Sequence, residues 1–220
     1  MSQISENLHN IKQVIKKQAV QCGRSVETIN LVAVSKKQSR EKIQQALNEG
    51  HRVFGENRVQ EAWEHWGDIH SHYNDLKLHL IGPLQTNKVK DAVALFDVIE
   101  TLDRPKLAEN LAKEMEKQNR SLACFVQVNI GEEEQKSGLL PNDLERFLSL
   151  CRALNLNIQG LMCIPPVQKP PAPYFALLAQ MAQKNNLDHV SMGMSNDFDK
   201  AIPLGATYVR VGTAIFGARD

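Results

Sequence analysis

Short apolar runs alternate with longer amphipathic segments along almost the whole chain. Eight runs have strand character, and most are separated by segments whose apolar residues recur at helical spacing. Strands that alternate with helices of this length predict βαβ units and a parallel sheet. The runs are apolar on both faces, as expected for strands buried on both sides. The expected strands are 31–35, 53–55, 78–82, 98–102, 124–130, 158–164, 189–194 and 208–212, and the clearest helices are 40–49, 106–118, 142–153 and 174–184.

Eight such units predict closure into a (β/α)8 barrel of the TIM type. The 220 residues exceed the lower limit of about 200 for this fold, so one domain over residues 1–220 with short loops is expected. The alternative is an open, doubly wound sheet. No strand–GxGxxG–helix signature stands near the start of the chain, which disfavours the dinucleotide-binding form of that alternative.

An additional helix is expected before the first strand. Its apolar residues Ile4, Leu8, Ile11 and Ile15 recur at three- and four-residue spacing. Ser2 or Ser5 is a suitable N-cap, and the Gly23 region ends the segment. The proline-rich stretch 164–173 follows the sixth expected strand, and we interpret it as a stiff loop that leads into a helix.

Composition excludes several classes of function. Lys plus Arg number 26 against 25 for Asp plus Glu, so no basic field attracts nucleic acid or a membrane surface. No run approaches the roughly 20 apolar residues that span a bilayer, and the first residues lack a signal peptide's apolar stretch. The four cysteines form no CxxC pair and no metal-ligand spacing, and free thiols indicate a reducing compartment. A cytoplasmic protein without a metal site is expected.

Polar residues follow the apolar runs at the end where a barrel of this kind places its active site. Lys36 and Lys37 follow the first run. An amine that is desolvated at a barrel mouth loses its charge more readily and becomes a better nucleophile toward an aldehyde. A solvated lysine is the alternative interpretation. Both faces of 31–36 are apolar, so periodicity does not choose between the two lysines.

The last two loops are suited to an anion. Barrels of this type often bind phosphate with the loops after strands seven and eight. Those loops here are 194–196 and 212–214, which offer glycine backbone and the hydroxyls of Ser195 and Thr213. A helix that begins after either loop would add its N–H groups. Alternatively, Ser195 caps a helix with Asp197 in its first turn.

Arg210 stands inside the last apolar run, where a charged side chain is unexpected unless it faces a polar group. It is able to donate a hydrogen bond to the pyridine nitrogen of a cofactor. A structural ion pair with Glu56 or Asp197 is an equally good interpretation from the residues alone.

A set of segments in fixed order resembles a known family. The segments are 31–36, 54–61, 79–82 with 84–88, 127–130 with 136–138, 160–162, 191–197 and 209–217. Together they resemble the YggS/PROSC family of pyridoxal phosphate homeostasis proteins, which is related to the N-terminal barrel of alanine racemase. The resemblance covers nearly the whole chain, and the ordered set is far more specific than any one segment.

The resemblance implies a site for pyridoxal 5′-phosphate (PLP) on six residues. These are Lys36 as the Schiff base, Asn57 near the ring, Arg210 at the pyridine nitrogen, and Ser195, Gly212 and Thr213 at the phosphate. The chain departs from the family pattern at two positions. Pro83 stands where the family usually has histidine, and Lys37 stands where it usually has a small polar residue. Neither departure removes an inferred cofactor contact.

The leading hypothesis is a PLP carrier or buffer, and not an enzyme. An arginine at the ring nitrogen leaves it unprotonated and weakens the ring as an electron sink. The chain ends at Asp220, soon after the last strand. We therefore expect no extra domain to supply a second acid/base, and we expect a monomer. PLP-dependent apo-enzymes are the expected partners. A slow racemase-like PLP enzyme and a barrel without cofactor are the alternatives.

Overall fold

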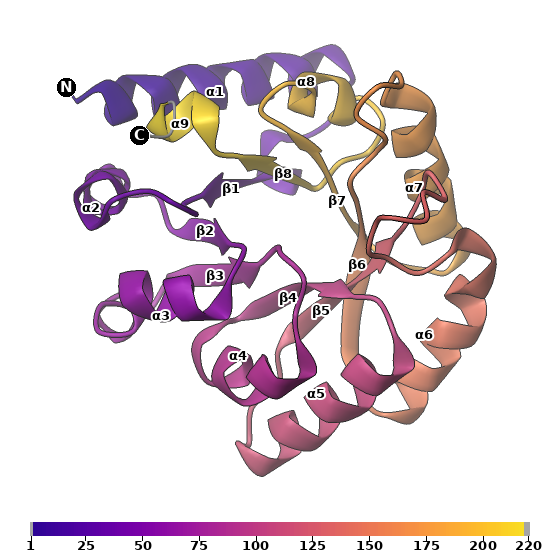
Figure 1. Ribbon diagram of the computed structural model, residues 1–220. Helices are drawn as coiled ribbons and strands as arrows, with labels where there is room; N and C mark the ends of the chain where they lie inside the picture. The colour runs from indigo at the N-terminus through magenta and orange to yellow at the C-terminus, as the bar shows by residue number, and fades with distance from the viewer. Residues whose placement is uncertain (1, 218–220) are drawn as a thin grey trace.

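The strands of the protein close into one parallel barrel in chain order (Figure 1). The structure is a computed structural model that describes residues 2–217. The strands are β1 (Asn30–Val34), β2 (Val53–Glu56), β3 (Lys77–Leu80), β4 (Val98–Leu102), β5 (Ala123–Val128), β6 (Asn157–Cys163), β7 (His189–Met194) and β8 (Tyr208–Val211). β1 pairs with β8 to complete the ring, with Ala33 beside Val211. The predicted (β/α)8 barrel is therefore confirmed, and the open sheet is excluded.

Helices cover the outside of the barrel, as Figure 1 shows. They are α1 (Gln3–Gln21), α2 (Arg40–Asn48), α3 (Val59–Trp66), α4 (Val89–Leu95), α5 (Pro105–Lys117), α6 (Leu144–Ala153), α7 (Ala172–Lys184), α8 (Phe198–Ala201) and α9 (Thr213–Phe216). The four helices expected between strands all form, with ends within two residues of their predicted positions. The proline-rich loop leads into α7, as expected.

The additional N-terminal helix is confirmed as α1. The Ser2 side chain accepts the backbone N–H of Ser5 at 3.2 Å, so Ser2 is the cap. The spaced apolar residues Ile4, Leu8, Ile11 and Ile15 are buried. The Nδ2 atom of Asn7 donates to the carbonyl of Ile215 at 2.8 Å, which joins α1 to α9 beside it. Both ends of the described chain therefore meet on one side of the barrel.

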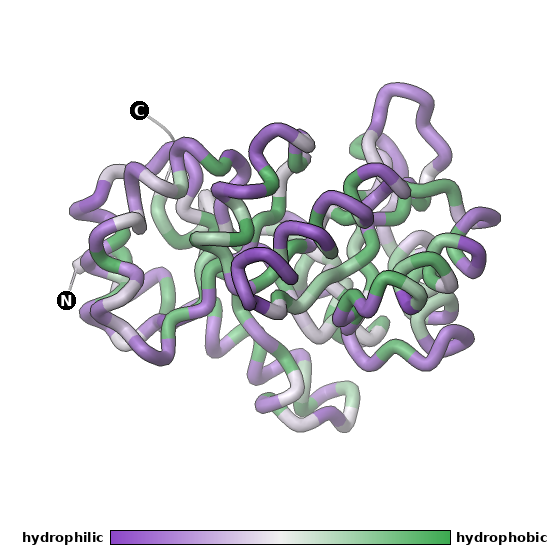
Figure 2. Tube along the Cα trace, turned by 90° about the horizontal axis from the view of Figure 1, so that it is seen from below, coloured by the Kyte–Doolittle hydropathy of each residue, from purple (hydrophilic) through white to green (hydrophobic). Residues whose placement is uncertain are grey.

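The main hydrophobic core lies between the strands and the helices. The outward turns of the trace are mostly hydrophilic in Figure 2, and the green hydrophobic stretches lie mainly inside. Trp66 of α3 is fully buried and packs on Phe54 of β2, with ring centroids 4.7 Å apart. Burial of apolar surface of this kind is the main favourable contribution to folding.

The barrel interior holds a second, smaller apolar cluster of Val98, Phe125 and Met162. Successive side chains of a strand point to opposite faces, so residues two positions apart share a face. Glu100 therefore follows Val98 on the interior face of β4, and Arg210 follows Tyr208 on that of β8. The interior changes from apolar to charged toward the carboxyl ends of the strands.

The fifth strand is shorter than predicted. It ends at Val128, whereas the sequence pattern suggested 124–130. The backbone N–H of Asn129 donates to the carbonyl of Leu139, and its side chain bonds both backbone groups of Glu133. Asn129 thus closes its own loop.

Candidate functional site

A cavity of about 490 Å³ lies at the carboxyl ends of the strands. The segments after β1, β2, β3, β6 and β7 line it, together with the end of β8 and the start of α9. Its apolar wall includes Val34, Ile81 and Ile164. The six residues predicted to form the site all line this one cavity: Lys36, Asn57, Ser195, Arg210, Gly212 and Thr213.

The two candidate lysines occupy different surroundings. Lys36 is partly buried and lines the cavity, whereas Lys37 is exposed and does not. The two follow β1 in a turn in which Lys37 has a φ angle of 56°. This left-handed backbone is unusual for a residue other than glycine, asparagine or aspartate. The backbone conformation, and not the apolar periodicity, therefore separates the two side chains.

Ser195 and Gly212 join the last two loops. The backbone N–H of Gly212 donates to the Oγ atom of Ser195 at 3.3 Å. Ser195 does not cap a helix, because α8 begins at Phe198 and Asp197 occupies its N-cap position. Asp197 instead accepts the backbone N–H of Met194 at 2.6 Å. The alternative interpretation of Ser195 as an ordinary helix cap is therefore wrong.

A Cβ atom at Gly212 would lie 3.3 Å from both Cβ and the carbonyl oxygen of Val34. The absence of a side chain therefore lets the end of β8 approach the end of β1 closely. This approach brings the hydroxyl-bearing loops to the same cavity as Lys36.

Arg210 is only 3% exposed and is fixed by three contacts. Its Nη1 atom donates to Ser191 Oγ at 2.5 Å, and its Nη2 atom donates to the carbonyl of Cys163 at 2.7 Å. Its charged partner is Glu100, at 3.7 Å. Arg210 therefore forms a structural ion pair, as one of the two interpretations expected. The expected partners Glu56 and Asp197 are wrong, because the partner is Glu100.

Sequence reasoning missed the network behind Arg210. Glu100 is fully buried and accepts hydrogen bonds from His79 and Ser191. Burial alone would raise the pKa of Glu100, but His79, Arg210 and Ser191 hold it below its ordinary value. One feature of the sequence could have revealed this network. Glu100 stands in the middle of the apolar run 98–102, and a buried carboxylate requires a partner.

Asn57 is placed by a close approach of two backbones. It directly follows β2, and a Cβ atom at Gly82 would lie 2.2 Å from the Asn57 carbonyl oxygen. Only glycine is compatible with that separation. Pro83, the next residue, is exposed and does not line the cavity.

Comparison with known proteins identifies the family. A family model described as the alanine racemase N-terminal domain matches residues 1–220. A curated Escherichia coli K12 protein named pyridoxal phosphate homeostasis protein is 37% identical over 232 residues, which cover 100% of this chain and 98% of the relative. A Vibrio cholerae protein of the same name is 40% identical over 231 residues, with the same coverage. The chain belongs to the pyridoxal phosphate homeostasis protein family.

Solved structures agree with this assignment. The PLP-bound structure of PipY, from Synechococcus elongatus, matches this member of the homeostasis protein family with a TM-score of 0.83 and 34% identity, covering 97% of this chain and 100% of PipY. An alanine racemase from Clostridium difficile matches with a TM-score of 0.76 at 14% identity and shows the shared barrel alone. Within residues 2–217, no helix combines the length and the apolar character needed to cross a membrane.

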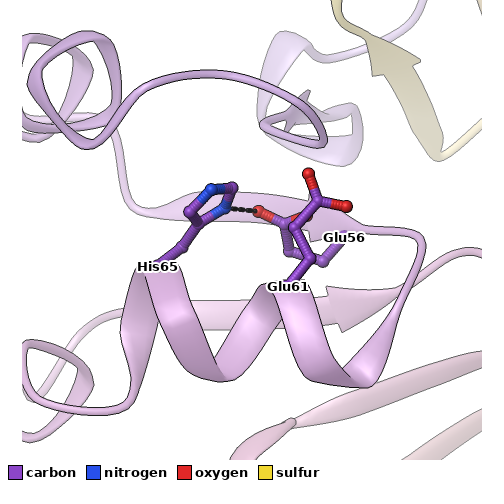
Figure 3. A group of neighbouring side chains, drawn as sticks. All are labelled: Glu56, Glu61 and His65. Carbon is purple, nitrogen blue, oxygen red and sulfur yellow. Dashed lines mark hydrogen bonds and ion pairs between the residues drawn. The ribbon is translucent and has the colours of Figure 1, made fainter.

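Beside the cavity, this homeostasis protein family member has a cluster that the sequence analysis did not single out. The ligand-type atoms of Glu56, Glu61 and His65 all lie within 4.8 Å of one another (Figure 3). His65 Nδ1 donates to Glu56 Oε1 at 2.8 Å. This hydrogen bond is the main reason that the pKa of His65 is raised. His65 thus donates to one carboxylate of the cluster, Glu56, while the second carboxylate, Glu61, lies nearby.

Proposed function

We propose that this chain binds PLP in the cavity as a Schiff base on Lys36 and carries or buffers the cofactor. The observation that carries the proposal is the meeting of the six residues in one cavity, with Lys36, the hydroxyls of the last two loops and Arg210 in its lining. The names of the curated relatives and the PLP-bound PipY structure support the choice of ligand.

The donors in the cavity fit the two ends of PLP. Ser195, Thr213 and the Gly212 backbone are suitable donors to phosphate oxygens, and they belong to the loops that hold phosphate in barrels of this type. Lys36 supplies the amine for an aldehyde. Val34 and Ile81 add apolar side chains to the same lining.

Arg210 supports a carrier function over strong catalysis. PLP supplies an electron sink whose strength depends on a protonated ring nitrogen. A guanidinium donates hydrogen bonds and does not give up its proton, so a nitrogen facing Arg210 accepts a hydrogen bond and stays unprotonated. Among the described lining residues, the side chains able to act as a second acid/base are Lys169, Lys200 and Asp197. The acidic residue in the lining, Asp197, already accepts the Met194 N–H.

We further propose that the barrel acts as a single-domain cytoplasmic monomer that supplies PLP to apo-enzymes. Cys22, Cys124, Cys151 and Cys163 are free, which suits a reducing compartment. Burial raises the pKa of Cys124 and of Cys163 to about 12, so both thiols stay protonated and unreactive. Lys36 is only partly buried, so a bound cofactor stays within reach of a partner at the cavity mouth.

Reduction of the loaded protein tests the proposal. Purified protein is incubated with PLP, reduced with borohydride, weighed intact and digested to locate the adduct. We expect one added PLP on the peptide that contains Lys36, and none in Lys36→Ala. Lys37→Ala is the matched control, because that neighbour does not line the cavity, and it should label as the wild type does. An adduct confined to another peptide, or no adduct at all, would contradict the proposal.

A further inference from the structure

The turn that contains Lys36 is held on both sides by carboxylates of the second β/α unit. Before Lys36, the hydroxyl of Ser35 donates to Glu56 Oε1 at 2.6 Å. After it, the backbone N–H of Lys37 donates to Glu61 Oε1. Glu56 ends β2 and Glu61 lies in the first turn of α3. The position of Lys36 in the cavity thus depends on a neighbouring element as well as on its own strand.

The turn itself has an unfavourable backbone. The N–H of Gln38 donates to the Ser35 carbonyl at 3.1 Å, so Lys36 and Lys37 are the two central residues of a β-turn. A φ angle of 56° at the second central position is the one that usually selects glycine or asparagine. A lysine there costs free energy that other contacts must offset. The hydrogen bond from the Lys37 N–H to Glu61 is such a contact.

Glu61 lies in a cluster with Glu56 and His65, whose ligand-type atoms are all within 4.8 Å of one another. It lies one helical turn before His65 on α3, and His65 is bonded to Glu56 (Figure 3). Glu56 is fully buried and also accepts the indole N–H of Trp66 at 3.2 Å. Residues three or four apart on a helix share a face, so Glu61 and His65 approach Glu56 together. The carboxylate that receives the Lys37 N–H therefore lies beside the hydrogen-bonded pair Glu56 and His65.

We propose that Glu61 is a positioning residue for Lys36. It accepts the Lys37 N–H, holds the left-handed turn, and so presents the Lys36 amine toward the cavity. This inference rests on the proposed Schiff base at Lys36. Glu61 acts through the reach of its acceptor oxygen and not through its negative charge. Its loss slows attachment of the cofactor while the barrel stays folded.

Two substitutions of Glu61 distinguish the effect of its side-chain length from the effect of its negative charge. Glu61→Asp keeps the charge but shortens the side chain, whereas Glu61→Gln keeps an acceptor oxygen at the same reach without the charge. The measurement is the initial rate at which PLP, added to cofactor-free protein, forms the visible Schiff-base band. We expect Glu61→Asp and Glu61→Ala to be about tenfold slower than the wild type, and Glu61→Gln to stay near it. Glu64→Ala, an exposed change on the same helix, is the matched control.

A second-site change tests the turn directly. Asparagine adopts the left-handed region more readily than lysine, so Lys37→Asn should restore most of the rate in the Glu61→Ala background. Circular dichroism checks that each variant is folded. If Glu61→Ala does not fold, the contrast between Glu61→Asp and Glu61→Gln still decides.

The outcomes are distinct. Wild-type rates in both Glu61→Asp and Glu61→Ala would overturn the inference and leave the proposed function standing. A Glu61→Gln rate as slow as that of Glu61→Ala, with a shifted pH profile, would overturn it in favour of a charge effect. No band in the wild type would end the proposed function and this inference with it.

Discussion

The Nδ1 atom of His79 and the Oε1 atom of Glu100 lie 2.7 Å apart inside the barrel, where both side chains are almost fully buried. Glu100 also accepts the hydroxyl of Ser191 at 2.5 Å and faces Arg210 at 3.7 Å. The buried carboxylate therefore has hydrogen-bond donors and a cation as partners on several sides. The same carboxylate fixes the orientation of an arginine that lines the cavity.

Removing the charge of Glu100 should destabilise the protein. Glu100→Gln leaves His79 and Arg210 without their buried anionic partner, and breaking such a pair costs about 3 to 5 kcal/mol. Urea unfolding followed by circular dichroism should show that decrease in the free energy of unfolding. Glu109→Gln, an exposed change on α5, should alter it by less than about 0.5 kcal/mol. Equal effects of the two changes would show that the network contributes nothing to stability.

His51 should make stability depend on pH. Burial lowers the pKa of His51 from 6.5 to about 4, and its Nε2 atom lies 2.8 Å from the carbonyl oxygen of Val53. Below pH 6.5 the unfolded chain takes up a proton at this residue that the folded chain does not. Stability should therefore fall as the pH decreases toward 4, by about 3 kcal/mol in total from this group.

The variant His51→Gln isolates this contribution, because other groups titrate over the same range. The free energy of unfolding is measured by urea titration at several pH values between 7 and 4 for both proteins. We expect the free energy of unfolding to fall more steeply with decreasing pH in the wild type than in the variant. The difference in slope should correspond to the uptake of about one extra proton on unfolding. Parallel curves would mean that His51 takes up its proton equally in both states.

Ser195 should contribute to the retention of PLP. Ser195→Ala removes a hydroxyl donor of the proposed phosphate site. A hydrogen bond to a charged group contributes roughly 1.5 to 3 kcal/mol, so the affinity for PLP should fall about tenfold or more. Equilibrium titration with PLP measures this, with the exposed Ser149→Ala on α6 as the control. Unchanged affinity would place the phosphate elsewhere.

The fold was predictable because the apolar pattern of each strand and helix lies within a short stretch of sequence. Each strand and helix is encoded in its own short stretch, and the rule that parallel strands end at one side then places Lys36 and Ser195 at the same face. The partner of Arg210 was not predictable in this way. Glu100 lies 110 residues earlier, and its burial inside the barrel depends on closure of the whole ring.

The choice between Lys36 and Lys37 shows a second limit. The two have the same charge and adjacent positions, and the apolar pattern before them is identical for both. Their difference arises from a φ angle of 56° at Lys37, which is held by Glu61 from 24 residues away. A contact of this kind follows from the packing of α3 on the strand ends, which no local pattern encodes.

Exchange of amino-acid α-protons distinguishes a carrier from a slow enzyme. If Arg210 keeps the ring nitrogen unprotonated, the loaded protein should stabilise a carbanion at the α-carbon poorly. We therefore expect the wild type with PLP to exchange the α-protons of a panel of amino acids in deuterated water no faster than Lys36→Ala with the same PLP. Proton NMR follows the loss of each α-proton signal. Rapid exchange in the wild type that disappears in Lys36→Ala would replace the carrier assignment with a racemase-like activity.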